Sequence, residues 1–329
     1  MEEVVLKTLL FGGGDERVAA AREVAKLSSK QRQKVAEKGV ISPLVSMLCE
    51  QDYEAIDAAL FALLSLAFGS ERNKIRIAKS GAIPEILKIL QCQIEPLLDT
   101  AAAALLILSS CTQNKSEIAA SGAIQLIIDL LNLNCDNISM QAKLDFTSTL
   151  HNLSTCPQSV RQIALSGCVV SLLQLIHGLE KSSDLVEKIM GLLEEIVSSS
   201  EIALKEAAET RDVISVLVEA MEEGSAQCKE HAVGILLVIC QNYKHGYGGV
   251  ILREGVMPGL LQLSVDGTWR GKEKAKELLL LLRDGSKSGS RGKQSKNVLL
   301  EKVMRKIDGG ERGGTSLKLV EEMIAKLRT

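Results

Sequence analysis

The sequence predicts an all-α fold in which helical repeats stack into a right-handed superhelix, and three observations predict it. The segment KSGAIPEILKIL at residues 79–90 recurs as ASGAIQLIIDLL at residues 120–131. Apolar residues make up 46% of the chain but aromatic residues only 2%, which suits helices packed through Leu, Ile, Val and Ala better than strands. With five prolines in 329 residues, long helices can form without interruption.

The duplicated segment belongs to a repeat that continues along most of the chain. The spacings between six aligned copies are 42, 41, 45, 44 and 44 residues, well above the period of roughly 33 or 34 residues of ankyrin and tetratricopeptide arrays. Because a unit of this size cannot bury its apolar face alone, we expect the copies to stack on one another. The copies are Gly39-Val40-Ile41, Gly81-Ala82-Ile83, Gly122-Ala123-Ile124, Gly167-Cys168-Val169, Arg211-Asp212-Val213 and Gly255-Val256-Met257.

Each copy has the same three parts, for example a short helix at Glu71–Lys79, a helix at 83–90 after the glycine, and a longer helix at 99–109. The glycine is expected to end the short helix with a positive φ, which disfavours residues that carry a Cβ. Prolines 43, 84 and 258 then fall in the first turn of the next helix, where a missing N–H does no harm. At Arg211, which stands in the glycine column, the turn should be strained or reshaped.

These parts predict the domain organisation. We expect a partial N-terminal cap repeat at residues 1–27, in which Asp15 caps the second helix. Six repeats follow at 28–69, 70–111, 112–155, 156–199, 200–243 and 244–284. Residues 285–329 should form a basic, partly flexible extension with short helices at 297–307 and 316–327. From residue 284 onward there are 11 Lys and Arg against 6 Asp and Glu, a net charge of +5, so the first 283 residues carry −7 of the total of −2.

Several short motifs resemble the armadillo (ARM) repeat family. They are the recurring GAI, HNLS at residues 151–154, and RNK and QNK at residues 72–74 and 113–115, within a three-helix unit over residues 1–284. The ending WRGKEKAKELLLLLR at 269–283 is similar to the last repeat of plant U-box ubiquitin ligases. Those ligases carry a U-box ahead of the repeats, whereas here the repeats begin at Met1. The resemblance implies either a relative without ligase machinery or the substrate-binding part of a ligase whose U-box is absent from this chain.

No motif in the sequence predicts catalysis, a cofactor or a metal site. GTWRGKEK at 267–274 has too few residues between its glycines for a phosphate loop, and no Ser or Thr follows its lysine. The eight cysteines contain no CxxC pair or Cys/His cluster, which indicates reduced thiols rather than a metal or disulfide framework. We therefore expect a non-enzymatic protein without a small-molecule substrate. Without a signal peptide or a long apolar run, the chain is expected in the cytoplasm, the nucleus or both, without a transmembrane segment.

The resemblance implies that the third helix of each repeat lines a concave groove. Counting from Asn152 in HNLS, positions 0, −4 and −7 fall on one helix stripe. Nuclear import receptors of the family place Trp and Asn down this stripe, but here the −4 column contains no tryptophan and the 0 column a single asparagine in seven. An acidic lining for basic peptides is missing as well. An importin-like transport receptor is therefore the third and least favoured hypothesis.

The stripe nevertheless identifies candidate partner-binding residues. Small residues at 103, 148, 191 and 234 are expected to form the groove floor, with Phe61 as an aromatic anchor near one end. Such a groove suits one or more protein partners that offer an extended or helical segment with apolar side chains. The chain itself is expected to be monomeric and to lack a dedicated nucleic-acid surface. The candidates are Arg22, Lys26, Phe61, Ser65, Ser148, Asn152, Lys188, Glu195 and His231.

Overall fold

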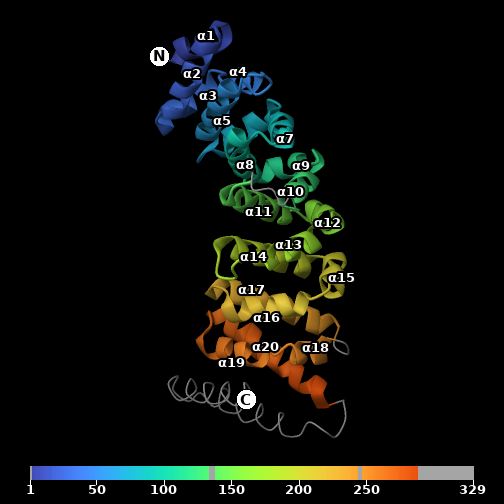
Figure 1. The fold of residues 1–329 in the computed structure, drawn as a ribbon. Helices are drawn as coiled ribbons and strands as arrows, with labels where there is room; N and C mark the ends of the chain where they lie inside the picture. Colours follow the sequence, from blue (N-terminus) through green and yellow to red (C-terminus); the bar gives the residue numbers. More distant parts are fainter. Residues whose placement is uncertain (1, 133–137, 244–246, 288–329) are drawn as a thin grey trace. The chain divides into compact units, whose positions relative to one another are not determined.

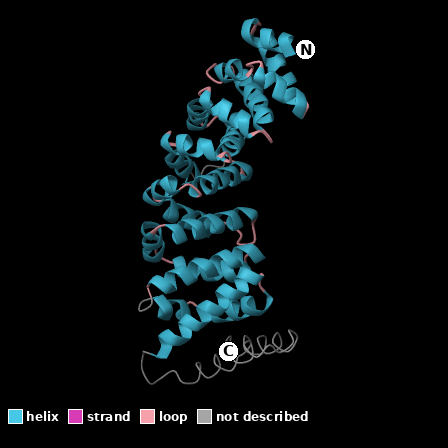
Figure 2. Cartoon of the chain, turned by 180° about the vertical axis from the view of Figure 1, so that it is seen from behind, coloured by secondary structure: helices cyan, strands magenta, loops and turns pink. Residues whose placement is uncertain are grey.

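A computed structural model describes residues 2–132, 138–243 and 247–287 of the chain, with side chains as far as Arg283. Within these ranges the structure is built from helices joined by short loops and contains no strand (Figure 2). The chain divides into two compact units, the first ending at Ser166 and the second beginning at Gly167. The all-α class predicted from the sequence is confirmed.

The first unit contains twelve helices among its described residues, and four of them form a series. In this series α2 packs on α5, α5 on α8, and α8 on α11 (Figure 1). The helices are α1 (Glu2–Phe11), α2 (Gly14–Lys26), α3 (Ser29–Glu37), α4 (Ile41–Met47), α5 (Tyr53–Ala67), α6 (Glu71–Lys79), α7 (Ala82–Cys92), α8 (Glu95–Ser109), α9 (Thr112–Ala120), α10 (Ala123–Asn132), α11 (Met140–Ser154) and α12 (Pro157–Leu165).

The second unit repeats this organisation with α14, α17 and α20 as its series, in which α14 packs on α17 and α17 on α20. Its described helices are α13 (Cys168–His177), α14 (Asp184–Ser199), α15 (Glu201–Glu209), α16 (Val213–Glu223), α17 (Ala226–Asn242), α18 (Tyr247–Arg253), α19 (Met257–Asp266) and α20 (Trp269–Lys287). Helix α20 thus includes the first residues of the predicted extension. The helices predicted at 297–307 and 316–327 lie outside the described residues.

We call α2, α5, α8 and α11 of the first unit, and α14, α17 and α20 of the second, the ladder helices. Local signals fix where most of them begin. The side chain of Asp52 accepts a hydrogen bond from the backbone N–H of Glu54 at the start of α5, and serines 139, 183 and 225 cap α11, α14 and α17 in the same way. The cap helix α2 differs from its prediction, because it starts at Gly14 rather than after Asp15. There Glu16 Oε2 accepts the backbone N–H of Gly13 at 3.0 Å.

The asparagines of the RNK and QNK motifs join two ladder helices, α5 and α8, to the short helices that follow them, α6 and α9. Asn73 is 2% exposed, and its Nδ2 donates to the carbonyl of Leu66 at 2.8 Å. Asn114, equally buried, donates to the carbonyls of Leu108 and Lys74 at 3.1 and 3.2 Å. Leu66 and Leu108 lie in the last turns of α5 and α8, where carbonyls lack a partner within the helix, so these buried amides tie the end of each of these two helices to the helix that follows.

The glycine turns confirm the repeat alignment at five of its six copies. Glycines 39, 81, 122, 167 and 255 all have φ between 74° and 97°, the left-handed region that glycine enters at little cost. At Gly81, the short helix α6 ends at Lys79 and α7 begins at Ala82, so two residues form the turn.

At the remaining copy, Arg211-Asp212-Val213, the predicted position of the turn is wrong by one residue. The left-handed position belongs to Asp212, with φ 61°, and not to Arg211. The turn is one residue longer than at Gly81, because α15 ends at Glu209 and α16 begins at Val213. Thr210 takes up the extra length in an extended conformation. The expected reshaping of this turn is therefore present, but Asp212 takes the place of the glycine.

This difference predicts that substitutions at Asp212 and at Gly81 have opposite effects on stability. Asp212→Gly should raise the free energy of unfolding by about 1 kcal/mol, because it removes a Cβ from the left-handed region. Gly81→Ala should lower the same free energy by about 1–2 kcal/mol for the converse reason. Urea denaturation followed by circular dichroism measures both. A loss of stability in Asp212→Gly would mean that the contact of Asp212 with Arg211, 3.6 Å apart, outweighs the backbone strain.

Among the described residues, no single helix is long and apolar enough to cross a membrane, although residues 157–165 and 168–177 together reach that length and apolar content as a bent pair. No group of three or more His, Cys, Asp or Glu side chains is placed to hold a metal ion in this part of the chain. The seven cysteines within it are free thiols, and four of them, Cys111, Cys168, Cys228 and Cys240, are buried.

Candidate protein-binding face

The ladder helices of the first unit are aligned by hydrogen bonds that pass from each helix to the next. Ser65 Oγ donates to the carbonyl of Ala25 at 2.9 Å, which joins α5 to α2. Asn152 Nδ2 donates to Ser109 Oγ at 3.0 Å, which joins α11 to α8. These bonds hold equivalent positions of successive helices side by side. The side chains that these helices turn away from the core form a surface that we call the ladder face.

The structure places the predicted candidates of the first unit on this face, although several already have partners. Arg22 and Lys26 are exposed on α2, where Arg22 pairs with Glu54 at 2.6 Å and Lys26 with Glu23 at 3.1 Å. Ser65 and Asn152 are half-buried and make the bonds just described. Ser148 is half-buried on α11. Arg22, Lys26, Ser65 and Asn152 are therefore already engaged in bonds within the protein. The side chain of Phe61 on α5, in contrast, is 51% exposed and can contact a partner directly.

The −7 column differs along the chain. Residues 58, 100 and 145 are buried, whereas residues 19 and 188 are exposed and residues 231 and 274 are half-buried. On α5 the exposed side chains continue to the residue that ends the helix and include residues that the sequence analysis missed. Phe68, seven residues after Phe61, is 71% exposed, and Tyr53 near the start of α5 is 56% exposed. The i, i+7 spacing of Phe61 and Phe68 was the sequence signal that could have found the second phenylalanine.

The exposure of these rings is unusual for this chain. It has eight aromatic residues, four Phe, three Tyr and one Trp, and all eight lie among the described residues. Phe146 is the only one that is buried, at 0% exposure. Three of the others are exposed along α5: Tyr53 is its first residue, Phe61 lies within it, and Phe68 is the residue that caps its C-terminus. Aromatic side chains are enriched at protein interfaces because each buries a large area at a small cost in conformational entropy.

Three aspartates lie on successive ladder helices of the first unit. Asp57, Asp99 and Asp145 lie on α5, α8 and α11. Burial raises the pKa of Asp57, although Thr100 Oγ1 donates to Asp57 Oδ1 at 3.4 Å and opposes that shift. Burial likewise raises the pKa of Asp145, and the nearby charge of Asp99 adds to it. Because Asp145 is only 7% exposed, the accessible carboxylates are the half-buried Asp57 and the exposed Asp99, which we call the acidic edge of the first unit.

In the second unit, a cluster of charged side chains spans the three ladder helices. Glu194 of α14 is its centre, because its two carboxylate oxygens contact His231 Nδ1 of α17 at 2.8 Å and Lys274 Nζ of α20 at 2.6 Å. Lys274 also lies 3.9 Å from Glu230 Oε1. Burial alone would raise the pKa of Glu194, but the hydrogen bonds from His231 and Lys274 and the charge of Lys274 hold it below its ordinary value. We call Glu194, His231 and Lys274 the ladder triad.

The ladder triad determines which of the predicted residues of the second unit are accessible to a partner. His231, a predicted binding residue, is half-buried and contributes to the triad, whereas Lys188 and Glu195 are exposed on α14. Gly234, expected in the groove floor, is buried, and a Cβ there would collide with Glu194 Oε1. Gly191 is half-buried, and a Cβ on it would lie 3.3 Å from His231 Nε2. These glycines make room for the triad side chains rather than for a partner.

The sequence was compared with those of known proteins. U-box domain-containing protein 45 of Arabidopsis thaliana is 30% identical over 272 residues, which cover 81% of this chain and 34% of that protein. U-box domain-containing protein 17 of the same plant is 29% identical over 284 residues, 74% of this chain and 38% of that protein. The chain thus spans about a third of the length of these relatives. No protein-family model matches the sequence.

The fold was compared with solved structures. An engineered protein superposes with a TM-score of 0.75 at 18% identity, over 99% of this chain and 78% of its own. A chain from a structure concerned with the interaction between cadherin and beta-catenin reaches 0.72 at 15% identity, over 93% and 58% of the two chains. A designed armadillo repeat protein in complex with the peptide (KR)4 reaches 0.51 at 18% identity, over 85% and 98%. The chain therefore has the armadillo-repeat fold, and about four-fifths of it is similar in sequence to plant U-box domain-containing proteins.

Proposed function

We propose that this chain is a non-enzymatic scaffold or adaptor that binds partner proteins along its ladder helices, with the aromatic stripe of α5 as the principal anchor. The observation that carries the proposal is the exposure of Tyr53, Phe61 and Phe68 along α5, in a chain that buries only one aromatic ring. Full burial of a phenylalanine side chain contributes about 1.5–3 kcal/mol. Two such rings are therefore enough to make this face a strong point of attachment.

The partner fits as a segment rather than as a flat surface. Tyr53 at the start of α5 and Phe68 just after its last residue are fifteen residues apart, which corresponds to about 22 Å along a helix. A partner helix of about four turns that lies along α5 could contact all three rings, and an extended segment that crosses the ladder could contact Phe61 and the acidic edge. The carboxylates of Asp57 and Asp99 favour a segment that also carries basic residues.

We also propose that the chain acts in ubiquitin-linked regulation or plant signalling, in the cytoplasm or the nucleus, of which the likeness to U-box domain-containing proteins supports the link to ubiquitin. A second candidate function has its own support. The relatives are U-box domain-containing proteins, and the chain matches about a third of their length. We therefore also consider that these repeats act as the substrate-binding part of a ubiquitin ligase. Detection of a U-box upstream of Met1 in the full transcript distinguishes the ligase from the adaptor.

The aromatic anchor predicts a selective loss of partners. In proximity labelling with the full chain, the double variant Phe61→Ala, Phe68→Ala should lower the labelling of direct partners at least tenfold, because it removes two anchoring rings. Phe11→Ala is the matched control, since Phe11 is 83% exposed in the same unit but lies on α1 rather than on a ladder helix. Glu195→Lys tests the ladder face of the second unit in the same way.

Two outcomes of this experiment would contradict the assignment of α5 as the anchor. If every labelled partner persists in the double variant, or if Phe11→Ala removes the same partners, the stripe on α5 is not the anchor. Thermal unfolding of each variant separates a loss of binding from a loss of fold, because both exchanged rings are exposed and contribute little to the core.

A further inference from the structure

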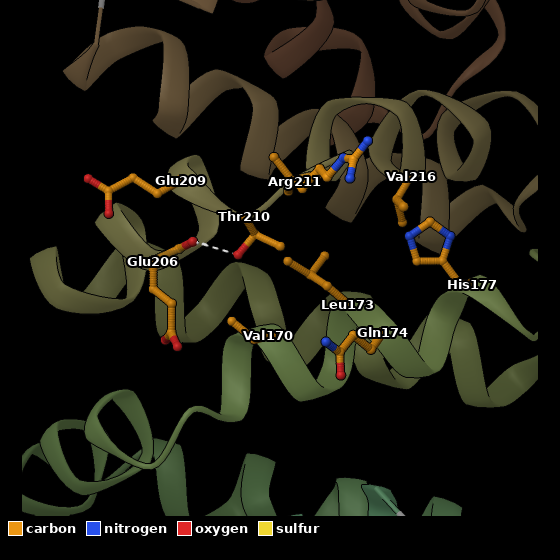
Figure 3. Close-up of a pocket in the computed structure, with 10 residues that line it drawn as sticks. Val170, Leu173, Gln174, His177, Glu206, Glu209, Thr210, Arg211 and Val216 are labelled. Atoms are coloured by element: carbon orange, nitrogen blue, oxygen red, sulfur yellow. Dashed lines mark hydrogen bonds between the residues drawn. The ribbon is translucent and has the colours of Figure 1, made fainter. Parts of the chain in front are cut away.

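The reshaped turn at residues 210–212 forms one wall of an open hollow that is separate from the ladder helices. The hollow has a volume of about 420 Å³ and lies among α13, α15 and α16 of the second unit (Figure 3). Its size falls in the range of small ligand pockets, roughly 300–1,000 Å³. It therefore offers room for two or three side chains of a partner.

The walls of the hollow are mostly apolar. Val170 and Leu173 of α13 and Val213 and Val216 of α16 line it. Such walls suit the methylene stem of a long side chain or a neighbouring aliphatic group. Polar side chains, including Gln174 and His177, lie at the outer part of the lining and are exposed.

The charged lining comes from the helix before the turn. Glu206 and Glu209 of α15 both belong to the hollow. Glu206 is half-buried, and its Oε2 is enclosed with no hydrogen-bond donor among the described residues. Burial raises the pKa of the Glu206 carboxyl. An enclosed carboxylate without a donor or cation is costly, so a positive group brought to it would be favoured.

Among the described residues, no basic side chain pairs with Glu206. Arg211 borders the hollow, but 94% of its side chain is exposed and its Nε lies 3.6 Å from Asp212. Lys205 of α15 lies 3.9 Å from Glu209 and pairs with that exposed carboxylate instead. Within the described part of the chain, the Glu206 carboxylate is therefore available to a cation from a partner.

We propose that this hollow, on α13, α15 and α16, is a second docking site that takes a lysine or arginine side chain next to an apolar one from a partner polypeptide. The basic group would pair with Glu206, and the apolar group would lie between Val170 and Val216. The longer turn at Thr210 makes this site possible, because it displaces the start of α16 by one residue relative to the glycine turns. The site does not depend on the ladder face, so the two can bind different segments.

The test is a titration of the full chain, methyl-labelled at Leu and Val, with synthetic hexapeptides. The probe peptides place one lysine or one arginine between leucines, and matched peptides replace that residue with norleucine. The methyl resonances of Val170, Leu173 and Val216 should shift and saturate with the basic peptides. Glu206→Gln should weaken the fitted Kd at least fivefold, because it removes the paired charge and keeps the side-chain shape.

Two controls make the result decisive. Glu223→Gln removes one negative charge from an exposed position at the end of α16 that does not line the hollow, and it should leave the Kd unchanged within twofold. Phe61→Ala should also leave it unchanged, so that failure of the ladder-face proposal is distinguishable from failure of this one. Equal binding of the norleucine peptides, an unaltered Kd in Glu206→Gln, or no shift of these methyls with any basic peptide would overturn the proposal. Circular dichroism establishes that each variant is folded.

Discussion

Phe146→Ala should lower the free energy of unfolding by about 3–5 kcal/mol, the range for removal of a large aromatic side chain from a packed core. Phe146 lies on α11, is 0% exposed and is the largest of the fully buried side chains. Alanine would leave a cavity where the surrounding aliphatic side chains can relax only in part. Urea denaturation of the full chain, followed by circular dichroism, measures the change.

Phe61→Ala is the matched control for this substitution, because the same side chain is removed from the same unit at a half-exposed position. It should change the free energy of unfolding by less than about 1 kcal/mol, the range of exposed substitutions. A loss as large as that of Phe146→Ala would mean that Phe61 belongs to the core and is not available to a partner. The pair therefore tests the division between core and ladder face that the proposed function requires.

The backbone of the repeat could be predicted from the sequence because it depends on strong local signals. Gly81 and Gly167 mark turns that need positive φ, and the apolar spacing after them fixes the next helix. The same signals fail at Asp212, since aspartate also tolerates the left-handed region and the turn there has one more residue. An alignment on spacing alone cannot distinguish Arg211 from Asp212 when the glycine is absent.

The candidate site was predictable only in part. Phe61 was found because its position on the helix period points away from the core, and Phe68 could have been found by the same step of seven residues. The ladder triad could not be found in this way. Glu194 and Lys274 are eighty residues apart and meet only because α14, α17 and α20 pack in series. Glu194 was adjacent to the predicted Glu195, but one residue along a helix changes the direction of a side chain by about 100°.

The ladder triad predicts a pH-dependent loss of stability in Glu194→Gln. At pH 7 this variant should unfold with a free energy about 2 kcal/mol below that of the unchanged chain, because His231 and Lys274 lose a charged acceptor in a site only 18–27% exposed. The pKa of Glu194 is lowered from the ordinary 4.5 by these partners. Its contribution to stability is therefore complete above pH 4.5 and is lost as the pH falls through the folded-state pKa.

Denaturation of both proteins at a series of pH values measures this difference, which should be largest at neutral pH and should shrink below pH 4.5. Glu195→Gln is the matched control, since Glu195 is the next residue of α14 and is exposed, and its effect should stay within about 0.5 kcal/mol. Equal losses in the two variants, or a Glu194→Gln difference that does not change with pH, would show that the triad does not join the helices. If the expected difference is found, a partly buried charged cluster holds the ladder helices of the second unit together. The first unit instead joins α11 to α8 by the neutral hydrogen bond of Asn152 to Ser109, and its charged pair between α2 and α5, Arg22 with Glu54, is exposed. Salt should therefore weaken the Arg22–Glu54 pair more than the triad, because partly buried charges are screened less than exposed ones.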